Sequence, residues 1–501
     1  MLRNNIDIEV FFGLVFALNG AKVKILIDDG ILYHWDTLQF DNWNTFQINK
    51  ENPKIIKIDR YQLNPLNYNF RRILTLKNHL LDVFLQKRII KKALNAYKVE
   101  NMEYIYYSDI INRNEVKYEN LEDLKKHAES SSIRFFRNCD LDYNNKYIRY
   151  YYNLSLKNAI LCRNIGKFVF YNLKPDLFLT SHGMYSTHGS TYEFLKENGI
   201  KCRLYITLSY TNKYYIKFID TKEQTLSRCK FWHDYKNKPL TEEMRKKVDN
   251  YFSGRFKGST VDIKVHSKYI KNTKSFIENS NDKYKYHIIL FSNIIFDGNI
   301  RDRHFAFDGL LDWLLSTIEY VKNRKDIKLY IRAHPREKRF SRNTPKIFEI
   351  LSKYIDINTI ENIVPISSDF KINTYEFVKN KIDLVIIYDG FLGLELPYLG
   401  IPTIICAGDG MTNVVGANKS IKNKEEYFNY LENVDKLINE YRDNRDIIRD
   451  NVIRYVYWYL FEDRIELPSF KFGLKFNNYF NLKFLNKRDL LINKNLIDLF
   501  N

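Results

Sequence analysis

The chain has 501 residues, of which 45% are hydrophobic and 28% charged, and its formal net charge is +19. This length exceeds one ordinary hydrophobic core, so the sequence predicts two α/β domains of similar size and excludes a chain that is disordered throughout. The charge suits a nucleic acid, an anionic membrane face or a phosphorylated substrate, but the basic residues spread along the whole chain, and a composition rich in Lys, Asn, Ile and Tyr explains them equally well.

The cysteines and the apolar segments indicate a compartment. None of the five cysteines stands in a CxxC pair, which favours a reducing environment and no structural zinc. Asp7 and Glu9 interrupt the apolar stretch at the start, and no run of 18 uncharged apolar residues follows. We therefore expect a cytoplasmic protein, at most peripheral on the inner face of a membrane.

In the first half, helical and strand-like patterns alternate. The predicted elements are a helix at 7–19, a strand in KVKILIDDG, amphipathic helices at 71–98 and 146–173, a strand at 177–180, a helix at 191–199 and a strand in IKCRLYITL. A nucleotide-binding domain normally opens with a strand before its first helix, and that strand is missing here.

The second half repeats the α/β pattern after a polar stretch at 211–285, for which we predict helices near 241–252 and 267–279. Its further elements are strands at 287–292, 328–331, 362–365 and 384–387, with helices at 308–323, near 345–354, at 374–380 and over 424–460. The resulting divisions are an α/β domain at 1–210, a connecting segment at 211–286, a second α/β domain at 287–423, C-terminal helices at 424–468 and a basic aromatic tail at 469–501.

Candidate ligand-binding residues follow two predicted strands of the second half. KLYIRAHPRE places Arg332, His334 and Glu337 after one strand, and YDGFLGLE places Gly390, Gly393 and Glu395 after another. Open α/β sheets bind ligands at the carboxyl ends of their strands, so we expect these two neighbouring strand ends to seat a diphosphate. The alternatives are a solvated charge cluster at the first strand and a tight turn, with Glu395 in an ion pair, at the second.

Two further loops carry candidate residues. Asn293 and Asp297 follow the first strand of the second domain and can grip a ligand hydroxyl or cap the next helix. In SHGMYSTHGS, His182 follows a buried strand and is our candidate general base, with His188 and Asp29 as reserves. Each His can equally be a hydrogen-bonded loop residue, and we expect neither a metal site nor a cofactor.

The second half resembles the carboxyl half of capsule or surface polysaccharide biosynthesis proteins, which are glycosyltransferase-like proteins of the GT-B type. The resemblance rests on the segments LFSNIIFDG, FDGLLDWLLSTIEY, KLYIRAHPRE, SSDFKINTYEF and YDGFLGLELPYLGIPTIICAGDG. Through SSDFKINTYEF it adds Asn373 and Tyr375 to the expected nucleotide-sugar site. One departure is Asp389-Gly390-Phe391, where the family usually has Ser or Thr.

The resemblance implies two Rossmann-like domains facing a cleft, with the acceptor against the domain at 1–210 and the nucleotide-sugar donor on the domain at 287–423. It also implies a metal-independent transfer of sugar from that donor to a surface or capsular polysaccharide, or to a lipid-linked glycan. Alternatives are a glycerophosphotransferase or a sugar-nucleotide epimerase of the same architecture, or a non-catalytic basic binding protein. We expect no nucleic-acid partner. The tail at 469–501 interleaves Lys with Phe and either contacts an anionic membrane surface or packs on the domain.

Overall fold

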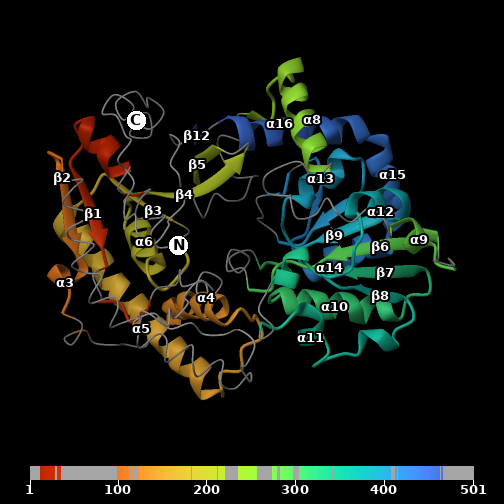
Figure 1. Ribbon diagram of the computed structural model, residues 1–501, viewed down its shortest axis with the longest axis horizontal. Coiled ribbons are helices and arrows are strands. Elements are labelled where there is room, and N and C mark those ends of the chain that lie inside the picture. Colours follow the sequence, from red (N-terminus) through yellow and green to blue (C-terminus); the bar gives the residue numbers. More distant parts are fainter. Residues whose placement is uncertain are drawn as a thin grey trace, which may run out of the picture.

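The structure is a computed structural model that describes residues 12–28, 31–34, 99–112, 122–181, 183–210, 213–219, 235–256, 273–278, 283–296, 304–339, 344–407, 412–414, 416–462 and 464–466, together with residues 9 and 116. The predicted helix at 71–98 and the tail at 469–501 lie outside the described residues, as do His182, Asp29 and Asp297. Figure 1 shows two α/β halves, the first in red to yellow and the second in green to blue.

The first half contains two small sheets. Its elements are β1 (Val23–Ile27), β2 (Met102–Tyr106), α3 (Tyr107–Ile110), α4 (Lys125–Phe136), α5 (Lys146–Phe168) with a π-helical turn (Val169–Leu173), β3 (Leu177–Ser181), α6 (Gly189–Glu197), β4 (Lys201–Tyr210) and β5 (Lys213–Ile219). Strands β1 and β2 pair in parallel, and β3, β4, β5 and β12 (Ile465–Glu466) form a mixed sheet. Strand β5 extends this sheet into the segment that we predicted to connect the domains.

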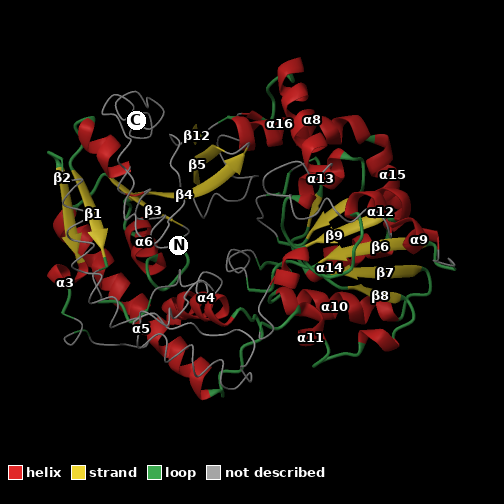
Figure 2. Ribbon diagram, viewed as in Figure 1, coloured by secondary structure: helices red, strands yellow, loops and turns green. Residues whose placement is uncertain are grey.

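The second half is a six-stranded parallel sheet with helices on both faces (Figure 2). Its elements are α8 (Glu242–Phe256), α9 (Thr273–Glu278), β6 (Tyr286–Phe291), α10 (Leu310–Lys322), β7 (Ile327–Arg332), the 3₁₀ helix Pro335–Arg339, α11 (Ile347–Leu351), the 3₁₀ helix Ile357–Thr359, β8 (Ile363–Ile366), α12 (Thr374–Lys381), β9 (Leu384–Ile387), α13 (Leu392–Tyr398), β10 (Thr403–Ile405), β11 (Lys419–Ser420), α14 (Lys424–Glu432), α15 (Val434–Asp443) and α16 (Arg445–Phe461). The α/β fold class predicted from the sequence is confirmed.

Alternation along the strands builds a core on each face of this sheet. Ile288 and Leu290 of β6 point to one face, where they join the core that holds Trp313 of α10. Ile289 and Phe291 point to the other face and join the core that holds Phe377 of α12. Because both faces are covered, these strands read as continuous apolar runs, which is typical of parallel sheets.

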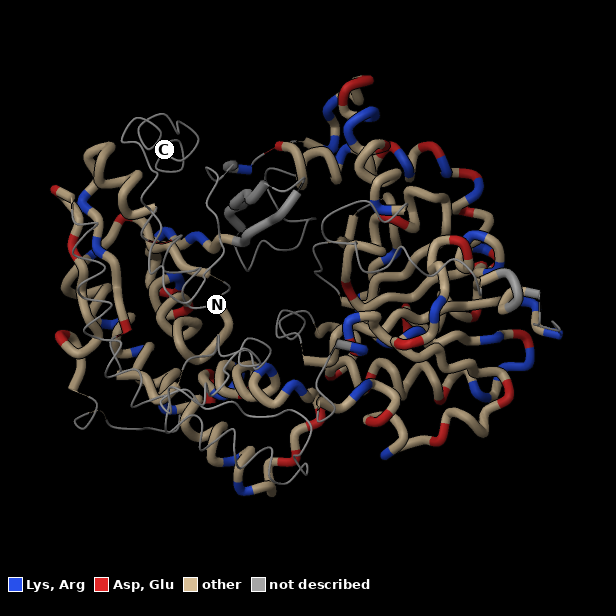
Figure 3. The backbone as a smooth tube through the Cα atoms, viewed as in Figure 1, with Lys and Arg blue, Asp and Glu red and all other residues tan. Residues whose placement is uncertain are grey.

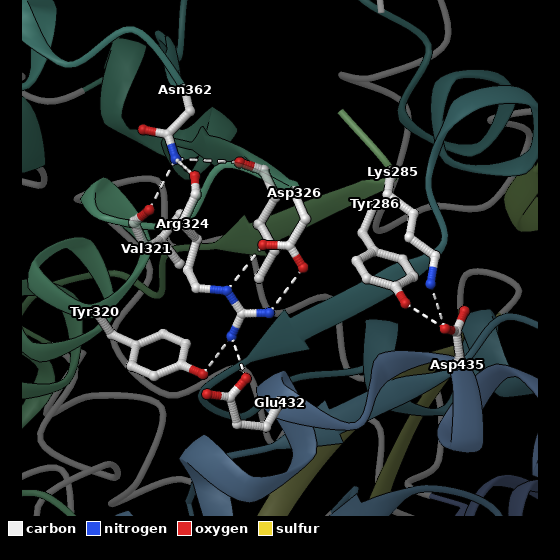
Figure 4. Close-up of polar contacts among 10 residues, drawn as sticks. Lys285, Tyr286, Tyr320, Val321, Arg324, Asp326, Asn362, Glu432 and Asp435 are labelled. Carbon is white, nitrogen blue, oxygen red and sulfur yellow. Dashed lines mark hydrogen bonds and ion pairs between the residues drawn. The ribbon is translucent and has the colours of Figure 1, made fainter. Parts of the chain in front are cut away.

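Polar contacts hold together the end of the sheet at which its strands begin, which we call the amino edge (Figure 4). Asn362, just before β8, donates from Nδ2 to the carbonyl oxygens of Val321, Arg324 and Ile327 at 2.7, 2.9 and 3.1 Å. Arg324 in turn pairs with Asp326 and Glu432. Contacts within the chain therefore hold this edge together.

The two halves meet at defined contacts as well as along the chain. Asp140, after α4, accepts hydrogen bonds from Lys353 Nζ and Tyr354 OH of the second half, both at 2.9 Å. The Arg137 guanidinium lies 5.6 Å from the centre of the Phe296 ring, in the loop after β6. The carboxyl end of β6 is thus directed toward the first half.

The described charges of the second half are mixed in sign. Figure 3 shows Lys and Arg interspersed with Asp and Glu over its helices. Among the described residues, no helix combines the length and the apolar character needed to cross a membrane.

Candidate functional site

The candidate site lies where the order of strands in the six-stranded sheet reverses. From β6 the chain moves to β7 and β8 on one side, and then to β9 and β10 on the other. Our expectation that β7 and β9 are neighbours is wrong, because β6 pairs with both and lies between them. The reversal falls between β6 and β9, which is where doubly wound sheets open a crevice for ligands.

Asn293 joins the two strand ends at this reversal. Its Nδ2 donates to the carbonyl oxygen of Asp389 at 2.8 Å, and its Oδ1 accepts from the Asp389 amide at 3.3 Å. The side chain thus makes the two hydrogen bonds that a neighbouring strand would make, and it extends the pairing of β6 and β9 by one step. Asn293 fixes the backbone of the loop after β9 and does not cap a helix.

Gly390 is the point of this loop where the backbone is open. Its φ is +141°, a region that favours glycine, and apart from its chain neighbours no described residue has an atom within 4 Å of where a Cβ would stand. Its amide donates to Asp389 Oδ1 at 2.8 Å, and the same oxygen accepts from Thr412 Oγ1 at 2.7 Å. A ligand can approach the backbone here, but the Gly390 amide already donates its hydrogen bond to the carboxylate of Asp389.

Gly393 serves packing. A Cβ at this position would lie 2.7 Å from Ile405 Cδ1 and 3.0 Å from Ile387 Cδ1. The glycine lets α13 lie directly on β9 and β10, which is the role of the last glycine in dinucleotide-binding turns.

His334 stands at the carboxyl end of β7, beside the end of β6. Its Nδ1 accepts a hydrogen bond from the amide of Arg336 at 3.1 Å, so the neutral ring carries its proton on Nε2. Pro335 starts the 3₁₀ helix that makes this contact. The orientation makes His334 a donor suited to a phosphate oxygen.

The two arginines around His334 differ in environment. Arg332 is 5% exposed and donates to the carbonyl oxygens of Ser367 at 2.6 Å and Phe370 at 3.1 Å, so it holds the loop after β8. Burial lowers the pKa of Arg332 to about 10. The side chain of Arg336 is exposed, and no ion pair of Arg336 is found within the described part of the chain. Of the two arginines, Arg336 is therefore the cation that a ligand at the surface can reach.

Glu395, Tyr375 and Asn373 are committed to the fold. Glu395 is fully buried, forms an ion pair with Arg255 of α8 and accepts from Tyr375 OH at 2.7 Å. Asn373 caps α12 by accepting from the Glu376 amide at 3.3 Å. The ion-pair alternative for Glu395 is therefore what the structure shows.

Glu337 lies beneath the site. Its side chain is 1% exposed, and neither carboxyl oxygen has a hydrogen-bond partner among the described residues. Burial raises the pKa of Glu337 to about 7. A direct contact between this carboxyl and a nucleotide sugar is not what its placement favours.

Three residues near the site escaped the sequence analysis. His304 bonds through Nδ1 to the hydroxyl of Tyr388 at the end of β9, and Thr412 and Arg255 make the contacts given above. Each partner is more than 20 residues distant along the chain. No local pattern could have indicated these pairs.

In the first half, the loop after β3 is braced by α4. Ser131 Oγ accepts from the Ser186 amide at 3.0 Å, and the two ring nitrogens of His127 lie 2.8 Å from Met184 O and 2.9 Å from Glu193 Oε2. Burial opposes ionisation of Glu193, but hydrogen bonds from His127 and Lys126 outweigh it and lower the pKa of this carboxyl.

His188 ends this loop, with Nδ1 3.0 Å from Thr187 Oγ1. His182 lies outside the described residues, so its role as general base stays a prediction. Within the described ranges, no three His, Cys, Asp or Glu side chains gather as they would around a metal ion.

Searches with family models and against curated proteins gave no match. Among solved structures, the chain is similar to the beta Kdo 2,4 transferase KpsC of Thermosulfurimonas dismutans, with 11% identity, a TM-score of 0.34, and coverage of 50% of this chain and 74% of the other. The chain is also similar to UDP-GlcNAc 2-epimerase from Neisseria meningitidis, bound to UDP-GlcNAc, with 14% identity, a TM-score of 0.28, and coverage of 61% of this chain and 81% of the other. For S. aureus MnaA in its UDP co-structure the identity is 14% and the TM-score 0.25, and the match covers 74% of this chain and 92% of the other. TM-scores at this level indicate no more than a broad likeness.

Proposed function

We propose that the protein is a glycosyltransferase that moves a sugar from a nucleotide-sugar donor to a surface or capsular polysaccharide, or to its lipid-linked precursor. The donor binds at the end of the six-stranded sheet at which its strands finish, which we call the carboxyl edge. The observation that carries the proposal is the crevice position between β6 and β9, where Asn293 fixes the two strand ends and Gly390 leaves the backbone open.

The charges of the site suggest where the donor phosphate lies. Asp389 already bonds the Gly390 amide and would repel a phosphate there. His334 and Arg336 stand at the end of β7 and offer a directed donor and an exposed cation. We place the phosphate toward these two residues and the sugar toward Gly390.

The reaction follows from this placement. An acceptor hydroxyl attacks the anomeric carbon of the donor, the bond from that carbon to the phosphate oxygen breaks, and the nucleotide leaves with the additional negative charge. His334 and Arg336 stabilise that charge as it develops. The acceptor lies against the first half, and His182 takes its hydroxyl proton.

The first prediction is that a nucleotide or nucleotide sugar stabilises the full-length chain. A ligand that binds only the folded state adds about 2.7 kcal/mol at a concentration of 100 times its Kd. A thermal-shift screen against uridine, cytidine, guanosine and adenosine diphosphates, cytidine monophosphate and their sugar conjugates measures this. A panel without a single concentration-dependent shift would overturn the proposal, and salt-sensitive stabilisation by RNA alone would favour the basic binding protein.

A further inference from the structure

A buried acid, Glu337, lies three residues after His334 of the proposed donor site. Glu337 belongs to the 3₁₀ helix Pro335–Arg339, and both of its carboxyl oxygens lack hydrogen bonds among the described residues although the side chain is 1% exposed. A carboxylate in such a place would lose its hydration, and the Ile347 amide and Lys346 nearby do not offset that loss, so the neutral acid is favoured.

The backbone of Glu337 is coupled to His334. The amide of Glu337 donates to the carbonyl oxygen of His334 at 2.9 Å, and the amide of Arg336 donates to the His334 ring at 3.1 Å. Pro335 lies between them and restricts the backbone. A displacement of Glu337 would therefore break the contact that holds the His334 carbonyl and would disturb the one that orients its ring.

The charged groups around Glu337 act on its pKa in both directions, and burial has the largest effect. Lys346 and the Ile347 amide at the start of α11 lower its pKa, but burial, Glu349 of α11 and Asp369 of the loop after β8 raise it. Lys346 already faces Asp369 at 3.4 Å. The 3₁₀ helix that carries Glu337 also carries Arg336, Lys338 and Arg339, and the titratable residue His334 directly precedes this helix.

We propose that Glu337 is a positioning residue that holds His334 in place while its carboxyl is protonated and releases it when the carboxyl ionises. The part of the proposal that concerns donor binding rests on the function proposed above, whereas the movement of the Pro335–Arg339 helix does not. The carboxyl has a higher pKa in the folded chain than in the unfolded chain. Its contribution to stability is therefore complete below about pH 4.3 and is lost as the pH rises through about 7.

Hydrogen–deuterium exchange of the full-length chain tests the movement. In the segment 333–347, wild type and Glu337→Gln should match at about pH 5.5, and wild type should exchange roughly tenfold faster at about pH 8.5. Comparison at one pH cancels both the intrinsic exchange rate and the titration of His334, which the two chains share. The segment 286–291 is the internal control and should not differ.

A second variant covers the case in which the unpartnered amide of Gln prevents folding. Glu337→Met is neutral and of similar volume, and it should show the slow exchange of Glu337→Gln at both pH values. Equal exchange of wild type and both variants at about pH 8.5 would overturn the proposal.

The binding arm uses the best nucleotide from the thermal-shift screen. Wild type should bind it about tenfold more weakly at about pH 8.5 than at about pH 6.5. Over the same pH range the binding of Glu337→Gln should weaken by less than about fivefold. A screen that yields no ligand counts against the proposed function and leaves the exchange result to decide the role of Glu337. The same pH dependence in both chains would reject the positioning role.

Discussion

At the scale of single residues, Glu395 lies where a ligand could bind, but its carboxylate is engaged in contacts within the fold. It lies one turn into the helix after β9, where an acidic residue can bind ribose hydroxyls, yet Arg255 and Tyr375 take up its two oxygens. Its side chain is 1% exposed and that of Arg255 is 11% exposed. The pair joins α8 to α13, and so it ties the segment that enters the second half to the helix beside the site.

Glu395→Ala should destabilise the chain strongly. Removal of one partner leaves the Arg255 charge buried and unpaired, which typically costs about 3–5 kcal/mol. Chemical denaturation followed by circular dichroism measures the change. Glu361, which pairs with Lys283 at the surface, provides the matched control, and Glu361→Ala should hardly move the unfolding midpoint. Equal midpoints for the two variants would show that the buried pair does not hold α8.

At the scale of elements, the two edges of the six-stranded sheet differ in their polar groups. The amino edge is held by Asn362 and Arg324, as the close-up in Figure 4 shows. The carboxyl edge carries His334, whose ring accepts from the Arg336 amide, and Gly390, where a ligand can approach the backbone. Substitutions at the first edge should therefore affect stability, and those at the second should affect binding.

Asn362→Ala should lower the free energy of unfolding by about 1–3 kcal/mol, because buried carbonyl oxygens lose their donor. Asn358, four residues earlier, is exposed and bonds Asp356, so Asn358→Ala is the control and should change stability by less than about 0.5 kcal/mol. Urea titration distinguishes the two. A stable Asn362→Ala chain would contradict the structural role of the amino edge.

Elements with a clear apolar period were predictable and those without it were not. The pattern gave α5, β6 and β9 almost at their observed bounds, because each buries an apolar face or run. It missed α4, whose buried side includes Ser130, Ser131 and Ser132. Their hydroxyls bond backbone carbonyls or Ser186, which makes polar burial possible without an apolar signal.

At the scale of the whole molecule, the chain crosses between its halves more than once. After α16 it returns to the first half, where β12 pairs with β5 in antiparallel register. This return and the order of strands in the six-stranded sheet depend on contacts between distant segments. The sequence located the strand ends of the candidate site, but it could not show that β6 separates β7 from β9, since several apolar runs have interchangeable patterns.

The central claim, that the carboxyl edge of the six-stranded sheet binds the donor, is tested most directly by calorimetric titration of the best nucleotide from the thermal-shift screen. The comparison uses wild type, His334→Gln at the carboxyl edge and Lys285→Gln, an exposed cation at the amino edge. We expect His334→Gln to weaken binding at least tenfold, about 1.4 kcal/mol, through loss of a charge-assisted phosphate contact. Lys285→Gln should stay within about twofold of wild type, as expected for a residue remote from the ligand. Unchanged binding by His334→Gln, or an equal loss in both variants, would contradict the account.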